Sequence, residues 1–69
     1  MNILFSERLQ QLRKEKGLSQ LEVAKVLNTT QRRISYMESG KVEPDLSTLV
    51  ALSNYFDVTT DYLIGIKDY

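Results

Sequence analysis

Apolar residues recur along the chain at helical spacing, whereas the alternation typical of strands is scarce. Phe5, Leu9 and Leu12 follow one another at i, i+4 and i+7, which places them on one face of an amphipathic helix. Ser6 is a suitable N-cap, and Gly17 suits the turn beyond a helix end. The pattern therefore predicts a first helix over about residues 7–16.

A second helix has the clearest start. Ser19 as N-cap and Glu22 three residues later form a capping box, in which each side chain bonds the other residue's backbone N–H. Leu18 and Val23 are spaced as a hydrophobic staple around this start. Asn28 tolerates the left-handed conformation of a tight turn, so it marks the end. The buried face is expected to consist of Leu21, Ala24 and Leu27.

A third helix is expected after Thr30 as N-cap, and it should stop at Gly40. About three residues separate it from the second helix, so it must leave at a steep angle. This is the spacing of a helix-turn-helix motif.

The remaining segments predict two more helices after one loop, residues 41–47, in which Pro44 precedes an Asp45 cap. The last helix has Thr59 as cap, a staple of Val58 and Leu63, and Gly65 at its end. The fourth helix is expected to bury Leu46, Leu49, Leu52 and Phe56. With five helices, no repeat and no linker, we expect one compact all-α domain over residues 1–69.

The third helix is unusually polar, and a helical wheel divides it into two faces. Ile34, Met37 and Glu38 share one side at 100° per residue. The other side carries Arg32, Ser35, Tyr36 and Ser39, with Gln31 and Arg33 on the flanks. Such groups can donate to base edges and phosphates in a DNA major groove. A plain solvated face is the alternative, but the i,i+4 pairs of opposite charge that support solvated helices are missing from this row.

Two polar residues on the inward side need a different explanation. Glu38 points toward the core, and a buried carboxylate requires a partner. Arg13, at the margin of the first helix's apolar face, could reach it, so we expect a structural ion pair. Gln20 opens the second helix, where free N–H groups and the helix dipole suit a phosphate; simply starting the helix is its other possible role.

Composition excludes several classes of site. The chain has neither histidine nor cysteine, so a zinc cage, a Ser-His-Asp triad and a Cys-His nucleophile are all impossible. The start MNILFSERLQ lacks a basic region followed by a long apolar one, and no apolar run reaches the ~18 residues of a membrane span. We therefore expect a cytoplasmic domain without metal, cofactor or membrane partner.

The net charge is zero, but the charges are not evenly distributed. Residues 8–41 hold eight lysines and arginines against three glutamates, a net +5, and the remaining residues carry −5. A chain polarised in this way can present a basic face to a polyanion despite its neutral total.

Four segments together resemble the helix-turn-helix domain of the lambda repressor and Cro family, also called the XRE family. They are LRKEKGLSQ at 12–20, ISYMESGK at 34–41, EPDLSTL at 43–49 and FDVTTDYLIG at 56–65. The resemblance covers about residues 6–65 and implies five helices, with the third entering the DNA major groove while the second crosses the backbone.

By position, the resemblance implies base contacts from Gln31, Arg32 and Tyr36. It implies phosphate contacts from Gln20, Thr30, Ser35 and Lys41, and it maps the family's structural ion pair onto Arg13 and Glu38. Arg33 stands where the family often has a small residue. We interpret it as a phosphate contact, with base reading or a flanking position as alternatives.

The resulting hypothesis is a sequence-specific double-stranded-DNA-binding transcriptional regulator, expected to be a repressor. A homodimer on a two-fold operator is expected, because one module reads few base pairs. The apolar C-terminal region that would form it, or else complete the core edge, consists of Tyr55, Tyr62, Ile64, Ile66 and Tyr69.

Two other classes of function are possible. A protein-interaction module of the same fold, binding a partner regulator, is the alternative. An enzyme is the weakest reading, because Asp57 and Asp61 resemble charges at a helix start more than a catalytic pair.

Overall fold

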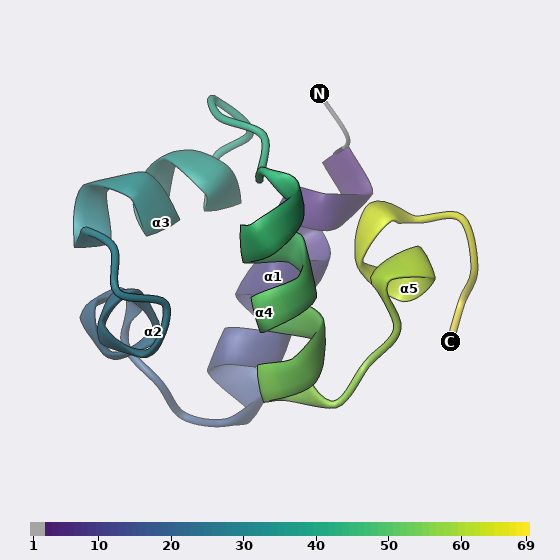
Figure 1. The fold of residues 1–69 in the computed structure, drawn as a ribbon, viewed down its shortest axis with the longest axis horizontal. Coiled ribbons are helices and arrows are strands. Elements are labelled where there is room, and N and C mark those ends of the chain that lie inside the picture. Colours follow the sequence, from purple (N-terminus) through teal and green to yellow (C-terminus); the bar gives the residue numbers. More distant parts are fainter. Residues whose placement is uncertain (1–2) are drawn as a thin grey trace.

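The computed structural model describes residues 3–69 and consists, over that range, of five helices without a strand. The helices are α1 (Ile3–Glu15), α2 (Gln20–Val26), α3 (Gln31–Glu38), α4 (Leu46–Phe56) and α5 (Thr60–Ile64). In Figure 1, α1 passes behind α4, with α2 and α3 on one side of this pair and α5 on the other. None of these helices is long and apolar enough to cross a membrane.

All five helices contribute to a single core. Its buried apolar residues are Phe5, Leu9, Val23, Ala24, Ile34, Met37, Leu52, Phe56 and Leu63. α3 packs against both α1 and α2, while α5 packs against α1 and α4. The compact five-helix, all-α fold expected from the sequence is thus the fold of residues 3–69.

The local signals for the starts of α2, α3, α4 and α5 are confirmed. The side chains of Ser19, Thr30, Asp45 and Thr59 each accept a hydrogen bond from the backbone N–H three residues on. The capping box is complete, since Ser19 N–H also donates to Glu22 Oε1 at 2.8 Å. This bond from the Ser19 backbone, together with the Ser19 hydroxyl, holds the pKa of the Glu22 carboxyl below its usual value.

The turn between α2 and α3 is as short as expected. Asn28 adopts the left-handed conformation with φ 55°, and Thr29 N–H donates to Ala24 O at 2.9 Å. This bond closes a Schellman motif that ends α2 and redirects the chain. In Figure 1, α2 is seen along its axis whereas α3 lies across the view, so the two helices meet at the steep angle of a helix-turn-helix.

Three expectations from the wheel and the caps are wrong. Ser6 does not cap α1 but lies inside it and is buried, because the helix already includes Ile3. Leu21 is 47% exposed, since it lies about 110° from the side of α2 defined by Val23, Ala24 and Leu27. Leu46 is 80% exposed, about 120° around α4 from buried Leu52.

The C-terminal segment folds back onto α1, a contact that the sequence did not indicate. The Arg8 guanidinium donates to the backbone carbonyls of Tyr62 and Lys67, the latter at 2.7 Å, and pairs with Asp68 at 3.3 Å. Its Cζ atom also lies 4.1 Å from the centre of the Tyr62 ring. Thr59 Oγ1 donates to Tyr69 O at 2.7 Å. Residues 65–69 are therefore held against α1 and α5.

Candidate nucleic-acid interface

The helix α3 is fixed to the protein body by one face. Thr30 caps its first turn, and Ile34 and Met37 are fully buried in the core. At the other end, Gly40 has φ 82° and Lys41 N–H donates to Tyr36 O at 2.9 Å. Both ends of α3 are therefore closed by local hydrogen bonds, and the opposite face is left to solvent.

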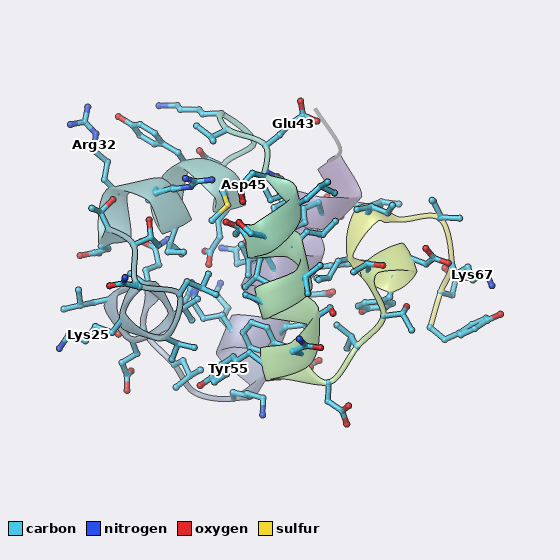
Figure 2. The ribbon with its side chains drawn as sticks, in the orientation of Figure 1. Lys25, Arg32, Glu43, Asp45, Tyr55 and Lys67 are labelled. Carbon is cyan, nitrogen blue, oxygen red and sulfur yellow. The ribbon has the colours of Figure 1, made fainter. Side chains whose placement is uncertain are left out.

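The outward face carries the row that the wheel predicted. Gln31, Arg32 and Ser39 are exposed, and Ser35 and Tyr36 are half-buried beside them. Arg32 points away from the body at the α2–α3 end of the molecule, and Lys25 on α2 also points outward at this end (Figure 2). The structure thus brings Gln31, Arg32, Ser35 and Tyr36 together on the outward face of α3.

Two side chains of this row, Arg32 and Tyr36, interact with each other, and the Tyr36 ring also interacts with Lys41, which follows α3. Arg32 Nε donates to Tyr36 Oη at 2.8 Å, and Arg32 Cζ lies 5.3 Å from the Tyr36 ring centre. Lys41 Nζ also lies 5.3 Å from the same centre. We call Arg32, Tyr36 and Lys41 the cation–tyrosine cluster. Both cations lie within the range of cation–π attraction, so the ring restricts where they point.

An ion pair buried behind α3 ties the helix to α1. Arg13 Nε donates to Glu38 Oε2 at 2.7 Å and Arg13 Nη2 to Glu38 Oε1 at 3.1 Å. The two side chains are only 12% and 4% exposed. The hydrogen bond to Glu38 raises the pKa of Arg13, outweighing the opposite effect of burial. The ion pair expected between Arg13 and Glu38 is therefore present and buried in the structure.

Gln20 joins this buried pair instead of pointing freely outward. Its Nε2 donates to Glu38 Oε1 at 3.1 Å, so Glu38 links α1, α2 and α3. Arg13 Nη1 donates in addition to Leu18 O at 2.8 Å, just ahead of α2. The Gln20 amide keeps a second hydrogen and its oxygen for another partner.

Arg33 reaches toward α4. Its Nη2 lies 3.6 Å from Asp45 Oδ2, and Asp45 at the same time caps α4 by accepting from Thr48 N–H at 2.8 Å. Hydrogen bonds from Thr48, aided by Ser47 and by the positive charge of Arg33, lower the pKa of Asp45 to about 2. In Figure 2, Asp45 lies where α4 begins, on the side facing α3. Arg33 therefore has an intramolecular partner that the sequence did not suggest.

The expected C-terminal apolar region is not one continuous surface. Tyr55 is half-buried against the core, where its ring meets Phe56 edge to face at 5.0 Å. Tyr62 lies under Arg8, and Ile64 is half-buried. Ile66 and Tyr69 are 68% and 74% exposed. Only these two of the five residues leave most of their surface free.

Sequence reasoning also missed an apolar pair on α4. Leu46 and Val50, one turn apart, are both exposed on the same side of that helix. Their i,i+4 spacing is visible in the sequence, but the apolar pattern of the fourth helix predicts that Leu46 is buried.

The sequence matches the Helix-turn-helix family over residues 9–63. Over 61 residues the chain is 46% identical to an SPbeta prophage-derived HTH-type transcriptional regulator, YonR, of Bacillus subtilis strain 168, and 43% identical to the HTH-type transcriptional activator BcrR of Enterococcus faecalis. Each match covers 88% of this chain, but only 56% and 30% of the relatives. The chain thus spans about half, or less, of the length of these relatives.

Among solved structures, the chain is similar to the P22 c2 repressor protein crystallised with a synthetic operator. The TM-score is 0.82 at 32% identity, covering 87% of this chain and 91% of the repressor. The relatives are transcriptional regulators and not enzymes, in agreement with the expectation from the sequence.

Proposed function

This chain belongs to the Helix-turn-helix family, and from that premise we propose that it is a sequence-specific double-stranded-DNA-binding transcriptional regulator, acting as a repressor. The observation that carries the proposal is the exposed polar row on α3. Gln31 and Arg32 lie at the start of a helix that the core holds by its opposite face. A helix presented in this way fits the width of a major groove.

The base-reading set comprises Gln31, Arg32 and Tyr36. Arg32 is suited to a bidentate contact with guanine O6 and N7, and Gln31 to one with adenine. Either contact is worth about 1–3 kcal/mol of discrimination between base pairs. That Gln31 and Arg32 are both exposed supports this assignment.

The phosphate-binding set comprises Gln20, Thr30, Arg33, Ser35 and Lys41. Lys41 follows the C-terminal end of α3 and Thr30 precedes its start, so these two flank the base-reading row. Gln20 can contribute the amide hydrogen that Glu38 does not use. To bind a phosphate, Arg33 must give up its 3.6 Å contact with Asp45. An exposed ion pair of this kind contributes only about 0–1 kcal/mol, so little free energy is lost when it breaks.

A homodimer on a two-fold operator completes the proposal, because a single helix reads few base pairs. Ile66 and Tyr69, the most exposed apolar residues of the C-terminal region, support an interface at that end of the chain. In Figure 2 the neighbouring Lys67 lies at the opposite end of the molecule from Arg32. Measuring the mass in solution at micromolar concentration, with and without DNA, tests this part. A monomer under both conditions contradicts it.

The test of DNA reading compares substitutions on α3 with a matched one far from it. Arg32→Ala and Gln31→Ala should each lose about 1–3 kcal/mol of preference for a duplex that the wild-type protein selects, measured by fluorescence anisotropy. Lys67→Ala also removes an exposed cation, but at the opposite end and beside the proposed dimer interface, so it can change the overall affinity but should leave the preference between base pairs unchanged. If neither α3 variant alters the preference, base reading by this row is wrong.

The dependence of DNA binding on salt concentration distinguishes a DNA-binding protein from a module that binds another protein. The logarithm of the binding constant should fall linearly with the logarithm of salt concentration, with a slope of about −0.9 per phosphate contact. Lys41→Ala should reduce that slope by about one contact without changing which sequence is preferred. A chain that is not retained on DNA even at low salt would favour a module that binds a partner regulator.

A further inference from the structure

Arg32 is held by only one of its three guanidinium nitrogens. Its Nε donates to the hydroxyl of Tyr36, one helical turn away, at 2.8 Å. No described residue accepts a hydrogen bond from Nη1 or Nη2 of Arg32. The guanidinium is thus held at Nε, while Nη1 and Nη2 at its outer end make no hydrogen bond to a described residue.

Because Arg32 bonds Tyr36 through Nε, its Nη1 and Nη2 groups stay available for a ligand. A guanidinium carries its five N–H groups in a fixed planar fork. When Nε is used within the protein, the end of the fork still presents Nη1 and Nη2 side by side. That pair of donors matches O6 and N7 of guanine, the bidentate contact of the major groove. The Tyr36 bond therefore orients the fork without using the donors that read a base.

Tyr36 is itself held in place, which a fully exposed side chain would not be. It is half-buried, its carbonyl accepts the N–H of Lys41 at 2.9 Å, and Ser39 Oγ donates to the same carbonyl at 3.2 Å. Its ring also attracts Arg32 and Lys41, each at 5.3 Å from the ring centre. The phenol thus has a fixed backbone and a restricted ring from which to hold Arg32.

We propose that Tyr36 is the positioning residue for Arg32, so that its hydroxyl contributes to specificity through the base pair that Arg32 reads and not through a base pair of its own. The proposal rests on the DNA-reading function proposed above and revises one of its assignments: Tyr36 serves the base-reading set through Arg32 and not by a direct base contact. Preorganisation of this kind removes part of the entropy that a free arginine loses on binding. Specificity at one base pair then depends on two residues of the cation–tyrosine cluster.

The test uses Tyr36→Phe, which deletes only the hydroxyl and keeps the ring. Each base pair of the selected duplex is changed in turn, and affinities are measured for the wild type, Tyr36→Phe, Arg32→Ala and the double variant. Tyr36→Phe should lower the preference about fivefold, the size of one net hydrogen bond, at the same base pair that Arg32→Ala affects. In the Arg32→Ala background it should have no further effect, because the anchored group is gone.

Two controls keep the result specific. Tyr55→Phe deletes the same atom from a ring packed against the core, away from α3, and should leave every base-pair preference unchanged. In the protein without DNA, the NMR signal of the Arg32 Nε–H group should shift in Tyr36→Phe and stay unchanged in Tyr55→Phe. This second readout reports the hydrogen bond directly and would not respond to a general change in stability.

The proposal is overturned if Tyr36→Phe weakens the preference at a different base pair, if its effect adds to that of Arg32→Ala, or if it has no effect. The first two results would leave DNA reading intact and give Tyr36 a contact of its own. A wild-type protein without any base-pair preference would overturn the proposed function together with this inference, so the two failures are distinguishable.

Discussion

Replacing Glu38 by glutamine removes a negative charge from a site where only 4% of the side chain is exposed. The carboxylate accepts two hydrogen bonds from Arg13 and one from Gln20, at 2.7–3.1 Å. An amide provides only one acceptor atom and no charge, so the Arg13 guanidinium, itself 12% exposed, would lose its counter-ion. The substitution therefore weakens the link between α1, α2 and α3.

Breaking a buried ion pair by changing one partner costs about 3–5 kcal/mol. Because the glutamine oxygen can still accept one bond, we expect the lower end, about 3 kcal/mol. For a chain of this length that corresponds to a fall in Tm of about 12–24 °C. Urea and thermal unfolding followed by far-UV circular dichroism measure both quantities.

Glu43→Gln is the matched control for this experiment. Glu43 is exposed and lies in the segment between α3 and α4 (Figure 2). The same chemical change there should alter the stability by no more than about 0.5 kcal/mol. Replacing both partners, as Arg13→Met with Glu38→Leu, should cost less than Glu38→Gln alone, because no charge is left buried. If Glu38→Gln costs less than about 1 kcal/mol, the ion pair is solvated and the reasoning fails.

Two further predictions concern the caps. The pKa of Asp45 lies at about 2, below its value in the unfolded chain. The stability that the ionised carboxylate contributes is therefore present above about pH 4 and is lost as the pH falls toward 2. Asp45→Asn keeps a capping oxygen but does not titrate, so its Tm should fall less between about pH 4 and about pH 2 than that of the wild type. An identical loss of Tm in both proteins would contradict this. Gly65 and Gly17 both have positive φ, but their surroundings differ. A Cβ added at Gly65 would lie 2.9 Å from Leu4 Cβ, whereas a Cβ added at Gly17 would have no neighbouring atom within 4 Å. In urea unfolding, Gly17→Ala should lower the free energy of unfolding by about 1 kcal/mol and Gly65→Ala by at least about 2 kcal/mol. Equal losses would show that the Leu4 side chain moves aside without cost.

The starts of α2, α3, α4 and α5 could be predicted from the sequence because a cap is a local event. Ser19, Thr30, Asp45 and Thr59 each need only a backbone N–H three residues away, and that distance is fixed once a helix forms. The Arg13–Glu38 pair could be predicted for another reason: a carboxylate on the core side of α3 must find a partner, and few cations could reach it.

The errors come from contacts between distant segments. A wheel gives directions around one helix, but the inward direction is set by its neighbours, so Leu21 and Leu46 were assigned to the core and are exposed. The bonds from Arg8 to the C-terminal segment span more than fifty residues of sequence and leave no local pattern. The contact between Arg33 and Asp45 crosses a loop whose path depends on how α3 and α4 pack.

Selection of bound duplexes from a random DNA pool tests the proposed function most directly. We expect the pool to converge on one sequence with two-fold symmetry, its half-sites about 34–36 Å apart along the helix axis, as a dimer of such domains requires. Binding of that sequence should exceed binding of the starting pool, and the excess should persist at moderate salt. A bound pool that cannot be distinguished from the starting pool at moderate salt would contradict the proposal that α3 reads DNA sequence.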